Sequence, residues 1–400
     1  MKFQSGRGNP AAFFFDNFPP TLQHDGMIPL HRKTLWTSSL LLTLASPGRA
    51  DDPPASLAAF FRVPAAFAQQ TSPGESPLVF ANGQPVTSPE QWPQRRAELL
   101  KRWQDLLGEW PPLIEHPSVE LLDSTAREGI TQERIRFLWT PREKTEGYLL
   151  IPPTPGPHPA VLTVYYEPET AAGLQGENRD FAWQLARRGF VALSIGTKEA
   201  SLAKTYSLYW PDPDAVTVQP LSMLACAAAN AWHVLAERPE VDPKRIGIVG
   251  HSFGGKWAMF ASCLFDRFAC AVWSDPGIAF DDTRPSINYW EPWYLGWHPQ
   301  PWRPRGLVTA EHPALGLYPT LRKQGRDLHE LHALMAPRPF LVSGGSEDPP
   351  ERWKVLNHTI GVNRLLGYEN RVAMSNRPNH APTPESNAVI YDFFSWVLKP

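Results

Sequence analysis

The sequence contains little cysteine, no long apolar run and no surplus of either charge. Its three cysteines in 400 residues are too few for a disulfide framework, and no Cys-x-x-Cys pair indicates a zinc site, so we expect buried apolar thiols. The 38 basic and 40 acidic side chains nearly cancel, which argues against nucleic acid as a partner, because phosphate binding needs a basic surplus. No stretch of about 18 apolar residues occurs, which excludes a transmembrane helix, and no membrane partner is expected. Hydrophobic residues still make up 42% of the chain, enough for a globular core.

The first 75 residues have the character of a targeting region rather than of a folded domain. A basic patch and an apolar run at 31–45, followed by small residues up to Ala50, are typical of a secretory signal that is cleaved after Ala50. Signal peptides begin at the chain terminus, so we expect Met27 to be the true start; a disordered tail with a chance apolar run is the alternative. Residues 51–75 are rich in Ala, Pro and Ser, which predicts a linker. The protein is therefore expected to be secreted or periplasmic, with its folded domain at 76–400.

Hydrophobic periodicity divides the folded part into a lead-in and an alternating half. The lead-in combines a helix at 92–107 with strands at 119–122, 130–140 and 148–151, which predicts antiparallel pairing. From residue 160 on, strands that are apolar on both faces alternate with helices. This pattern is typical of a mostly parallel sheet covered by helices on both faces, so the fold class is α/β. The strands are expected at 160–166, 190–195, 246–249, 269–273, 339–342 and 371–374, and the helices at 178–188, 221–237, 253–264 and 384–398.

A Gly-x-Ser-x-Gly motif, Gly250-His251-Ser252-Phe253-Gly254 (the elbow), lies between a predicted strand and a predicted helix. The turn that joins them is so tight that a Cβ atom at either glycine would clash. It raises the Ser252 hydroxyl above the end of the sheet and directs the Phe253 N–H, at the helix N-terminus, toward a developing oxyanion. The motif therefore predicts a serine nucleophile; an inert tight turn is the alternative.

A serine hydroxyl needs a base that removes its proton and an acid that orients the base. After such a motif, the acid and then the histidine follow the serine along the chain. Asp348, in the loop after a predicted strand, is the predicted acid, and the neighbouring Glu347 is an alternative. His380, in the polar loop before the last helix, is the predicted base.

The second oxyanion donor is expected from the loop after the strand at 160–166. The backbone N–H group of Tyr166 or of Glu167 is the candidate. A carboxylate beside an oxyanion would repel it, so we expect the Glu167 side chain to point toward substrate or to pair with a cation.

Several segments outside the elbow carry a resemblance to a known family. They are Ala81-Asn82-Gly83-Gln84-Pro85-Val86-Thr87 before Trp92, Gly255-Lys256 after the elbow, Asp327-Leu328-His329-Glu330-Leu331, and Ala333-Leu334-Met335-Ala336-Pro337-Arg338-Pro339. Over most of residues 78–398 the chain resembles the α/β-hydrolase superfamily, and within it the carbohydrate-esterase branch that includes bacterial glucuronoyl esterases and acetyl-xylan-esterase-like proteins. The resemblance implies an α/β-hydrolase fold and an esterase that acts on carbohydrate.

The same resemblance assigns roles to residues around the elbow. Glucuronoyl esterases carry Gly-Cys-Ser-Arg-x-Gly-Lys there, where the arginine helps to hold the oxyanion and the lysine contacts sugar hydroxyls. In this chain His251 replaces the cysteine and Phe253 replaces the arginine, while Lys256 matches, which implies that Lys256 binds substrate. Some members place the catalytic acid one strand earlier, in a segment that aligns with Trp273-Ser274-Asp275-Pro276-Gly277. Asp275 is therefore the alternative acid.

An aromatic-rich insertion, about residues 278–325, precedes the last two strands. Insertions at this place in the fold overhang the active site, and Trp290, Trp293 and Trp297 offer faces on which sugar C–H groups pack. The insertion is expected either to bind carbohydrate or to form an aromatic cap that only shields the pocket. The loop at 197–214 is expected to form another wall.

Together these features predict an exported serine esterase that hydrolyses carboxylic esters on a small or polymeric carbohydrate. Ser252 attacks the carbonyl, His380 transfers the proton and Asp348 orients the imidazole, with an acyl-enzyme as intermediate. This chemistry needs no metal or organic cofactor, and His329-Glu330-Leu331-His332 lacks the spacing of a helical metal site, so packing is expected there. A peptidase related to prolyl oligopeptidase and a non-catalytic sugar-binding protein on the same fold are the alternatives.

Overall fold

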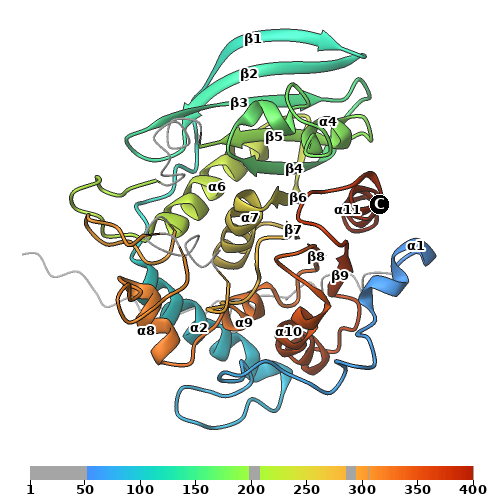
Figure 1. The fold of residues 1–400 in the computed structure, drawn as a ribbon. Coiled ribbons are helices and arrows are strands. Elements are labelled where there is room, and N and C mark those ends of the chain that lie inside the picture. The colour runs from blue at the N-terminus through green and yellow to red at the C-terminus, as the bar shows by residue number, and fades with distance from the viewer. Residues whose placement is uncertain (1–51, 198–207, 285–293, 305, 400) are drawn as a thin grey trace, which may run out of the picture. The chain divides into compact units, whose positions relative to one another are not determined.

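The computed structural model describes residues 52–197, 208–284, 294–304 and 306–399. Within these residues nine strands form one sheet (Figure 1). The strands are β1 (Val119–Arg127), β2 (Ile130–Leu138), β3 (Lys144–Ile151), β4 (His158–Tyr165), β5 (Val191–Gly196), β6 (Val241–His251), β7 (Cys270–Ser274), β8 (Phe340–Gly344) and β9 (Val372–Asn376).

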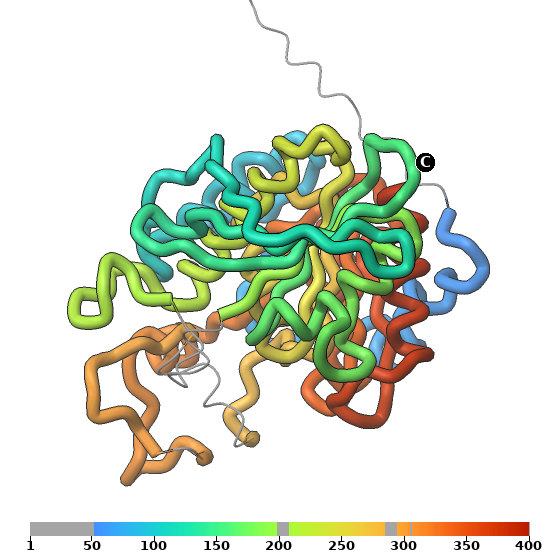
Figure 2. The backbone as a smooth tube through the Cα atoms, turned by 90° about the horizontal axis from the view of Figure 1, so that it is seen from above, coloured from blue at the N-terminus to red at the C-terminus, as the bar shows by residue number. Residues whose placement is uncertain are grey.

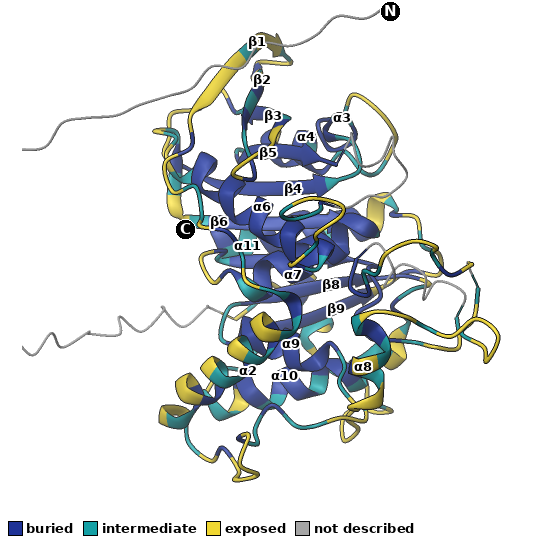
Figure 3. Ribbon diagram, turned by 90° about the vertical axis from the view of Figure 1, so that its left-hand side faces the viewer, coloured by how far each residue is buried: buried dark blue, intermediate teal, exposed yellow. Residues whose placement is uncertain are grey.

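The strand order in the sheet is β1-β2-β3-β5-β4-β6-β7-β8-β9. β1, β2 and β3 pair antiparallel, β3 also pairs antiparallel with β5, and the remaining pairs are parallel. The expected antiparallel lead-in and mostly parallel sheet are therefore confirmed. β4 and β5 are buried on both faces, whereas β1 at the sheet edge is largely exposed (Figure 3). A parallel strand buried on both faces needs apolar residues throughout, which explains the continuous apolar sequence of β4 and β5.

Helices cover both faces of the sheet. They are α1 (Ala55–Ala58), α2 (Trp92–Leu107), α3 (Pro168–Ala171), α4 (Phe181–Ala186), α6 (Pro220–Ala236), α7 (Phe253–Leu264), α8 (Leu317–Lys323), α9 (His329–His332), α10 (Trp353–Leu365) and α11 (Pro384–Leu398), with 3-10 turns at Ala59–Phe61, Pro89–Gln91, Ala333–Met335 and Pro350–Arg352. One core packs α2, α6, α7, α9 and α10 against the sheet, and a second packs α1, α4 and α11 against it. Leu162 of β4 belongs to the first core and Val161 to the second, as the alternation of side chains along a strand requires. Among the described residues, no helix is both long and apolar enough to cross a membrane.

Residues 52–75 pack on the domain, which corrects the prediction that this segment is a linker. Leu57 is buried in the core that also contains α11. The Asn357 side chain on α10 donates to the carbonyl oxygens of Phe67 at 2.8 Å and Gln70 at 2.6 Å. The few apolar side chains among the alanines and prolines are buried against the sheet and its helices, so the overall composition of the segment is misleading.

The three cysteines, Cys226, Cys263 and Cys270, are buried, as expected. Burial raises the pKa of all three thiols, that of Cys226 to about 12. At neutral pH the thiols are therefore protonated and pack as apolar groups.

The described part of the aromatic-rich insertion is attached to the start of α6. The Leu221 N–H donates to the Tyr294 carbonyl at 2.8 Å, and the Trp297 N–H donates to the Gln219 side chain at 3.1 Å. In Figure 2 the insertion (orange) and the 208–218 loop (yellow-green) project on the same side of the sheet. The described part of the insertion therefore lies against the start of α6.

Candidate active site

The elbow between β6 and α7 holds Ser252 in a strained backbone conformation. Ser252 has a φ of 57° and a ψ of −115°, a combination that residues other than glycine rarely adopt. A Cβ atom on Gly250 would stand 2.1 Å from the Gly254 carbonyl oxygen, and one on Gly254 would stand 2.0 Å from the Val164 oxygen. Both glycines are therefore required for the strand–turn–helix arrangement.

Ser252, His380 and Asp275 form a continuous hydrogen-bonded chain. The His380 Nε2 lies 2.8 Å from the Ser252 Oγ, and its Nδ1 lies 2.7 Å from the Asp275 Oδ2. Asp275 follows β7 and has a fully buried side chain, whereas the His380 side chain is 38% exposed. In this arrangement the imidazole can take the serine proton on one side while a carboxylate fixes its orientation on the other.

Asp348, the acid predicted from the sequence, does not contact His380 in the described part of the chain. Its carboxylate accepts the N–H groups of Gly277 at 2.8 Å and Ile278 at 2.6 Å. The expected contact between Asp348 and His380 is therefore corrected: Asp275, the alternative acid that the family resemblance implies, contacts the imidazole instead. Because β7 and β8 are parallel neighbours, the loops that follow them carry both aspartates at the C-terminal ends of the strands. The conformations of these loops decide which aspartate contacts the imidazole.

The two acids at 347 and 348 have partners of their own. Burial raises the pKa of the Asp348 carboxyl, and the charge of Asp275 raises it further, while the backbone N–H groups and Arg352 oppose this change. Glu347 forms an ion pair with Arg284 at 2.7 Å. Neither carboxylate is in position to orient the imidazole.

A buried arginine, which no sequence motif marks, holds the histidine loop in place. Arg377 donates to the carbonyl oxygens of His380 at 2.7 Å, Ala381 at 2.9 Å and Ser343 at 2.8 Å. It thereby ties the loop after β9 to the end of β8. Burial lowers the pKa of the guanidinium, and the charges of Asp275 and other neighbours only partly oppose this effect. An Arg-Pro pair in a polar loop carries no distinctive signal, so its role depends on the folded loop.

His251 is buried beside the imidazole of His380. The two ring centroids are 4.7 Å apart, and the His251 Nδ1 lies 3.1 Å from the Ser274 hydroxyl. Burial lowers the pKa of His251 well below its usual value, and the charges of His380 and Arg377 lower it further. His251 therefore stays neutral near pH 7. It places no positive charge next to His380 that would oppose protonation of that imidazole.

The side chain of Phe253 is enclosed in a stack of aromatic rings. It is 1% exposed, and its ring centroid lies 4.7 Å from that of Tyr166 and 5.4 Å from that of Tyr294. The Phe253 amide belongs to the first turn of α7, where N–H groups point out of the helix end and the helix dipole is positive. The structure brings Phe253 and Tyr166 together, and the role of their N–H groups toward an oxyanion stays a prediction.

Lys256 lies one turn into α7, with its side chain only 6% exposed. The ammonium group donates to the Pro276 carbonyl. Burial lowers the pKa of Lys256 to about 8, although the charges of Asp348, Glu347 and Asp275 act in the opposite direction. Lys256 thus lies just beneath the loop that carries Asp275, and its binding of substrate stays a prediction.

The structure describes only some of the other residues that are predicted to contact substrate. Trp290 and Trp293 lie outside the described residues. Trp297 is half-buried and is attached through its backbone to Gln219. Glu167 directly precedes α3 and is also half-buried. Substrate binding by these residues remains a prediction.

The segment His329–His332 forms α9, and its two histidines contact different neighbours. The His329 Nε2 lies 2.8 Å from the Glu75 carbonyl oxygen, whereas the His332 Nε2 lies 3.3 Å from the Met259 sulfur. Both imidazoles are buried in helix packing, as expected from their spacing.

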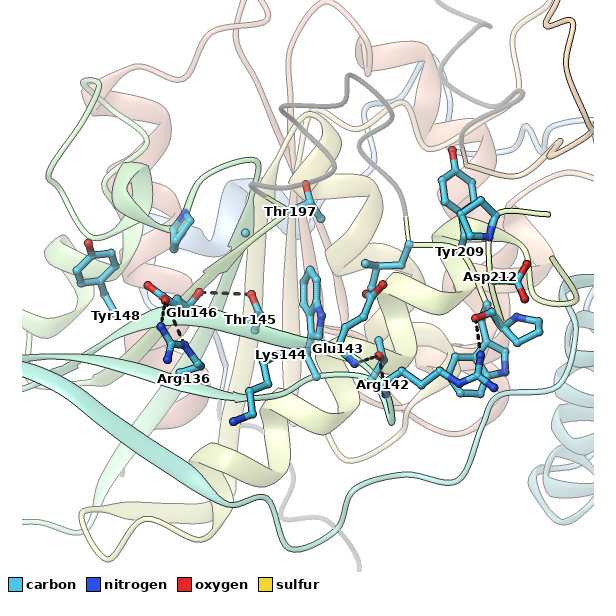
Figure 4. A pocket seen from close by; sticks show the side chains of 18 of the residues that line it. Arg136, Arg142, Glu143, Lys144, Thr145, Glu146, Tyr148, Thr197, Tyr209 and Asp212 are labelled. Carbon is cyan, nitrogen blue, oxygen red and sulfur yellow. Dashed lines mark hydrogen bonds and ion pairs between the residues drawn. The ribbon is translucent and has the colours of Figure 1, made fainter. Parts of the chain in front are cut away.

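A cavity of about 850 Å³ opens at the C-terminal ends of the parallel strands, the side of the sheet on which the elbow also lies. It is lined by the end of β2, the start of β3, the end of β5, the start of α3 and residues 208–213 (Figure 4). Thr197 and residues 208–213 of the 197–214 loop line this cavity, and the expected contribution of the loop to a wall of the active site stays a prediction.

Two protein-family models match overlapping parts of the chain. The prolyl oligopeptidase family matches residues 228–349, and the dienelactone hydrolase family matches residues 145–276. Both matches include the elbow and Asp275.

Similar proteins of known sequence include 4-O-methyl-glucuronoyl methylesterases. The one from Neurospora crassa is 26% identical over 208 residues, which cover 50% of this chain and 48% of that protein. The one from Thermothelomyces thermophilus is 27% identical over 218 residues, with 50% and 48% covered. The chain therefore spans about half the length of these curated relatives.

Solved structures extend the similarity over most of the fold. A glucuronoyl esterase from Solibacter usitatus has a TM-score of 0.63 at 17% identity and covers 82% of this chain and 99% of its own. A glucuronoyl esterase of carbohydrate esterase family 15 from Caldicellulosiruptor kristjansonii has a TM-score of 0.57 at 20% identity, with 84% and 93% covered. The sheet topology, the serine elbow and these matches together identify the chain as an α/β-hydrolase that resembles the carbohydrate esterases.

Proposed function

We propose that this protein hydrolyses carboxylic esters carried by carbohydrates, through a Ser252-His380-Asp275 triad and an acyl-enzyme. One observation carries the proposal: His380 is hydrogen-bonded to the Ser252 hydroxyl at 2.8 Å and to the Asp275 carboxylate at 2.7 Å. The names of the similar proteins, glucuronoyl methylesterase and glucuronoyl esterase, support an ester on a carbohydrate as the substrate.

Each of these residues has a defined role in the proposed reaction. The His380 Nε2 takes the Ser252 proton as Oγ bonds to the ester carbonyl carbon, and the N–H groups of Phe253 and Tyr166 stabilise the oxyanion that forms. His380 then gives the proton to the leaving alcohol as the C–O bond breaks, and the acyl group stays on Ser252. A water molecule that loses its proton to His380 attacks the acyl-enzyme and forms a second tetrahedral intermediate. As this intermediate collapses and the bond to Oγ breaks, His380 returns the proton to Oγ, which frees the acid and Ser252. Asp275 holds the imidazole in the tautomer that keeps Nε2 free to accept.

Covalent labelling tests whether the serine is a nucleophile. A fluorophosphonate probe is expected to label the folded wild-type protein and to leave Ser252→Ala unlabelled. Acetylated xylan and a methyl glucuronate ester, assayed side by side, then identify the acyl chemistry. Folded protein that neither takes the label nor cleaves either ester would be a sugar-binding protein rather than an esterase.

A serine peptidase is the second candidate, because the prolyl oligopeptidase family model matches residues 228–349. The same triad would attack an amide, with His380 protonating the leaving amine. A dipeptidyl anilide included in the assay separates the two functions. Turnover of the anilide without turnover of the esters would favour the peptidase.

We further propose that the protein is exported, with the signal at 31–50 removed. The basic patch, the apolar run and the small residues before Asp51 support this proposal, although the segment lies outside the described residues. N-terminal sequencing of protein from the medium or periplasm tests it. A mature chain that begins at Asp51 supports export, and one that begins at Met1 contradicts it.

A further inference from the structure

We infer that the 850 Å³ cavity is a subsite for an uncharged sugar residue next to the one that carries the ester. The inference rests on the proposed function, because it assigns the carbohydrate part of that substrate to a defined surface. Aromatic, acidic and hydrogen-bonding side chains line the cavity, among them Trp139, Glu143, Thr197, Tyr209 and Trp210 (Figure 4).

The cavity and the elbow both lie at the C-terminal ends of the parallel strands, and two strand spacings, from β6 to β4 and from β4 to β5, separate them. Val164 of β4 pairs with Gly250 of the elbow, and Tyr165, the last residue of β4, pairs with Gly196, the last residue of β5. Gly196 and Pro168 line the cavity. Neighbouring strands lie about 4.8 Å apart, so the near wall of the cavity is roughly 10 Å from the elbow. A chain of sugars whose ester lies at the serine would extend into it.

No donor among the described residues reaches the carboxylate of Glu143. In the described part of the chain no hydrogen bond or ion pair reaches it, although its backbone is fixed by the Thr140 hydroxyl at 3.0 Å and the Trp139 N–H at 3.1 Å. The side chain is accessible to solvent and points into the cavity, in the direction opposite to Lys144 (Figure 4). The surrounding walls desolvate the carboxyl and raise its pKa. An accessible but poorly hydrated carboxylate gains from hydroxyl donors.

Trp139 contributes a fixed aromatic wall. Its side chain is 6% exposed, and its indole nitrogen is covered by protein atoms, so it offers the cavity ring surface rather than a donor. The ring packs on Trp257 with centroids 6.1 Å apart, which fixes its position. A rigid aromatic surface near a carboxylate that can accept from hydroxyl groups fits a polyhydroxylated ligand.

The two arginines at the cavity are already engaged, and the Lys144 side chain points away from Glu143 (Figure 4), which argues against an anionic ligand. Arg136 pairs with Glu146 at 2.6 Å. Arg142 donates to the Pro211 carbonyl at 3.1 Å and lies over the Trp210 ring, 5.1 Å from its centroid. The fixed Trp210 ring adds an apolar surface for sugar C–H groups. Hydroxyl groups and apolar ring faces are the combination that a neutral sugar presents.

Binding measured without turnover tests the subsite independently of catalysis. Calorimetric titration of the Ser252→Ala protein with xylohexaose, which is uncharged and carries no ester, is expected to show binding. In the same background Glu143→Gln removes the charged acceptor and Trp139→Phe places a smaller ring in the cavity wall, and each is expected to weaken binding about threefold to tenfold. Matched controls are Glu237→Gln, at a surface glutamate, and Trp232→Phe, at another buried indole without an acceptor among the described residues. Both controls are expected to leave binding unchanged.

Turnover then places the subsite on the substrate. Glu143→Gln and Trp139→Phe in the active protein are expected to lower kcat/KM for an esterified xylo-oligosaccharide about threefold to tenfold. They are expected to change kcat/KM for the corresponding small ester by less than about twofold. Equal losses on both substrates, binding of xylohexaose that neither variant weakens, or no binding at all would overturn the inference. Binding of xylohexaose that both variants weaken, in a protein that cleaves no ester, would support the subsite while refuting the proposed function.

Discussion

The carboxylates of Asp275 and Asp348 each accept hydrogen bonds from the backbone of the loop that carries the other. The Asp275 Oδ1 accepts the N–H of Gly345 at 2.6 Å and of Asp348 at 2.8 Å, while Asp348 accepts the N–H groups of Gly277 and Ile278. A Cβ atom at Gly345 would stand 2.6 Å from the Asp275 Oδ2, so this close approach requires glycine. The loops after β7 and β8 are thus joined by both acids, but only Asp275 directs an oxygen at the imidazole.

This asymmetry predicts different effects of the same substitution at the two acids. Asp275→Asn is expected to lower kcat on an ester about 10⁴-fold, because an amide at this position favours the wrong imidazole tautomer. Asp348→Asn is expected to keep kcat within about tenfold of the wild type. It should instead lower the free energy of unfolding by about 1–3 kcal/mol, because the amide cannot accept both N–H groups. Steady-state kinetics and urea unfolding at pH 7 measure the two effects, and a kcat loss at Asp348 as large as that at Asp275 would contradict the assignment.

The elbow and the histidine could be predicted from the sequence because local features fix each of them. The glycines and Ser252 define a turn whose following helix begins where the motif requires, and α7 spans the predicted residues 253–264. α11 likewise spans the predicted 384–398, because the Thr383 hydroxyl accepts the Ser386 N–H at 3.2 Å and caps the helix. His380 lies between the end of β9 and that cap, so the short loop holds it at the C-terminal ends of the strands.

The acid could not be decided from the sequence, because the choice depends on contacts between distant segments. Asp275 and Asp348 both follow buried strands, and nothing local shows that Gly345 gives Asp275 room to reach the imidazole. The position of β5 between β3 and β4 and the function of Arg377 are also set by segments far apart in the chain. The sequence predicts a linker at 51–75 for the same reason, since the few apolar side chains of residues 52–75 are buried only in the folded domain.

Replacement of Arg377 is expected to affect catalysis by moving the histidine loop. Arg377→Lys loses the planar set of donors that holds the His380 and Ser343 carbonyl oxygens, and lysine cannot reproduce it. We expect kcat to fall by up to about 100-fold with little change in KM, because a displaced base affects the chemical step. Arg371→Lys, at another buried arginine beside β9, is the matched control and should leave kcat unchanged. A loss of kcat in both variants, or a rise in KM alone in Arg377→Lys, would contradict the positioning role.

A methyl group at Gly254 is expected to prevent formation of the elbow. The Gly254→Ala Cβ would stand 2.0 Å from the Val164 carbonyl oxygen, and that oxygen belongs to a buried central strand that cannot move freely. The variant should lose fluorophosphonate labelling and more than about 3 kcal/mol of stability. Gly361→Ala, within α10, is the control, because its Cβ would meet only a Leu78 side-chain atom, at 3.9 Å. Alanine in a helix interior is favoured over glycine by up to about 1 kcal/mol. Normal labelling of Gly254→Ala would show that the turn is looser than these contacts require.

Because the Lys256 ammonium is buried, the free energy of unfolding is expected to change with pH in the alkaline range. Folding lowers the pKa of Lys256 from 10.5 to about 8, so between these values the unfolded chain binds a proton that the folded chain lacks. The free energy of unfolding should therefore rise with pH in this window, by up to about 1.4 kcal/mol per pH unit. Below pH 8 the full cost of burying the charge, about 3 kcal/mol, weakens the folded state.

Lys256→Met removes this cost and is therefore expected to be more stable than the wild type at pH 7, by up to about 3 kcal/mol. The difference should shrink as the pH rises from 8 and vanish near 10.5, which urea unfolding at pH 7, 9 and 10.5 measures. Lys101→Met, at a lysine whose side chain is 74% exposed, should change stability by less than about 0.5 kcal/mol at each pH. The same Lys256→Met protein should show a raised KM for a carbohydrate ester if the ammonium contacts sugar hydroxyls. A variant that is less stable at pH 7, or whose stability difference does not change with pH, would mean that Lys256 carries no buried charge.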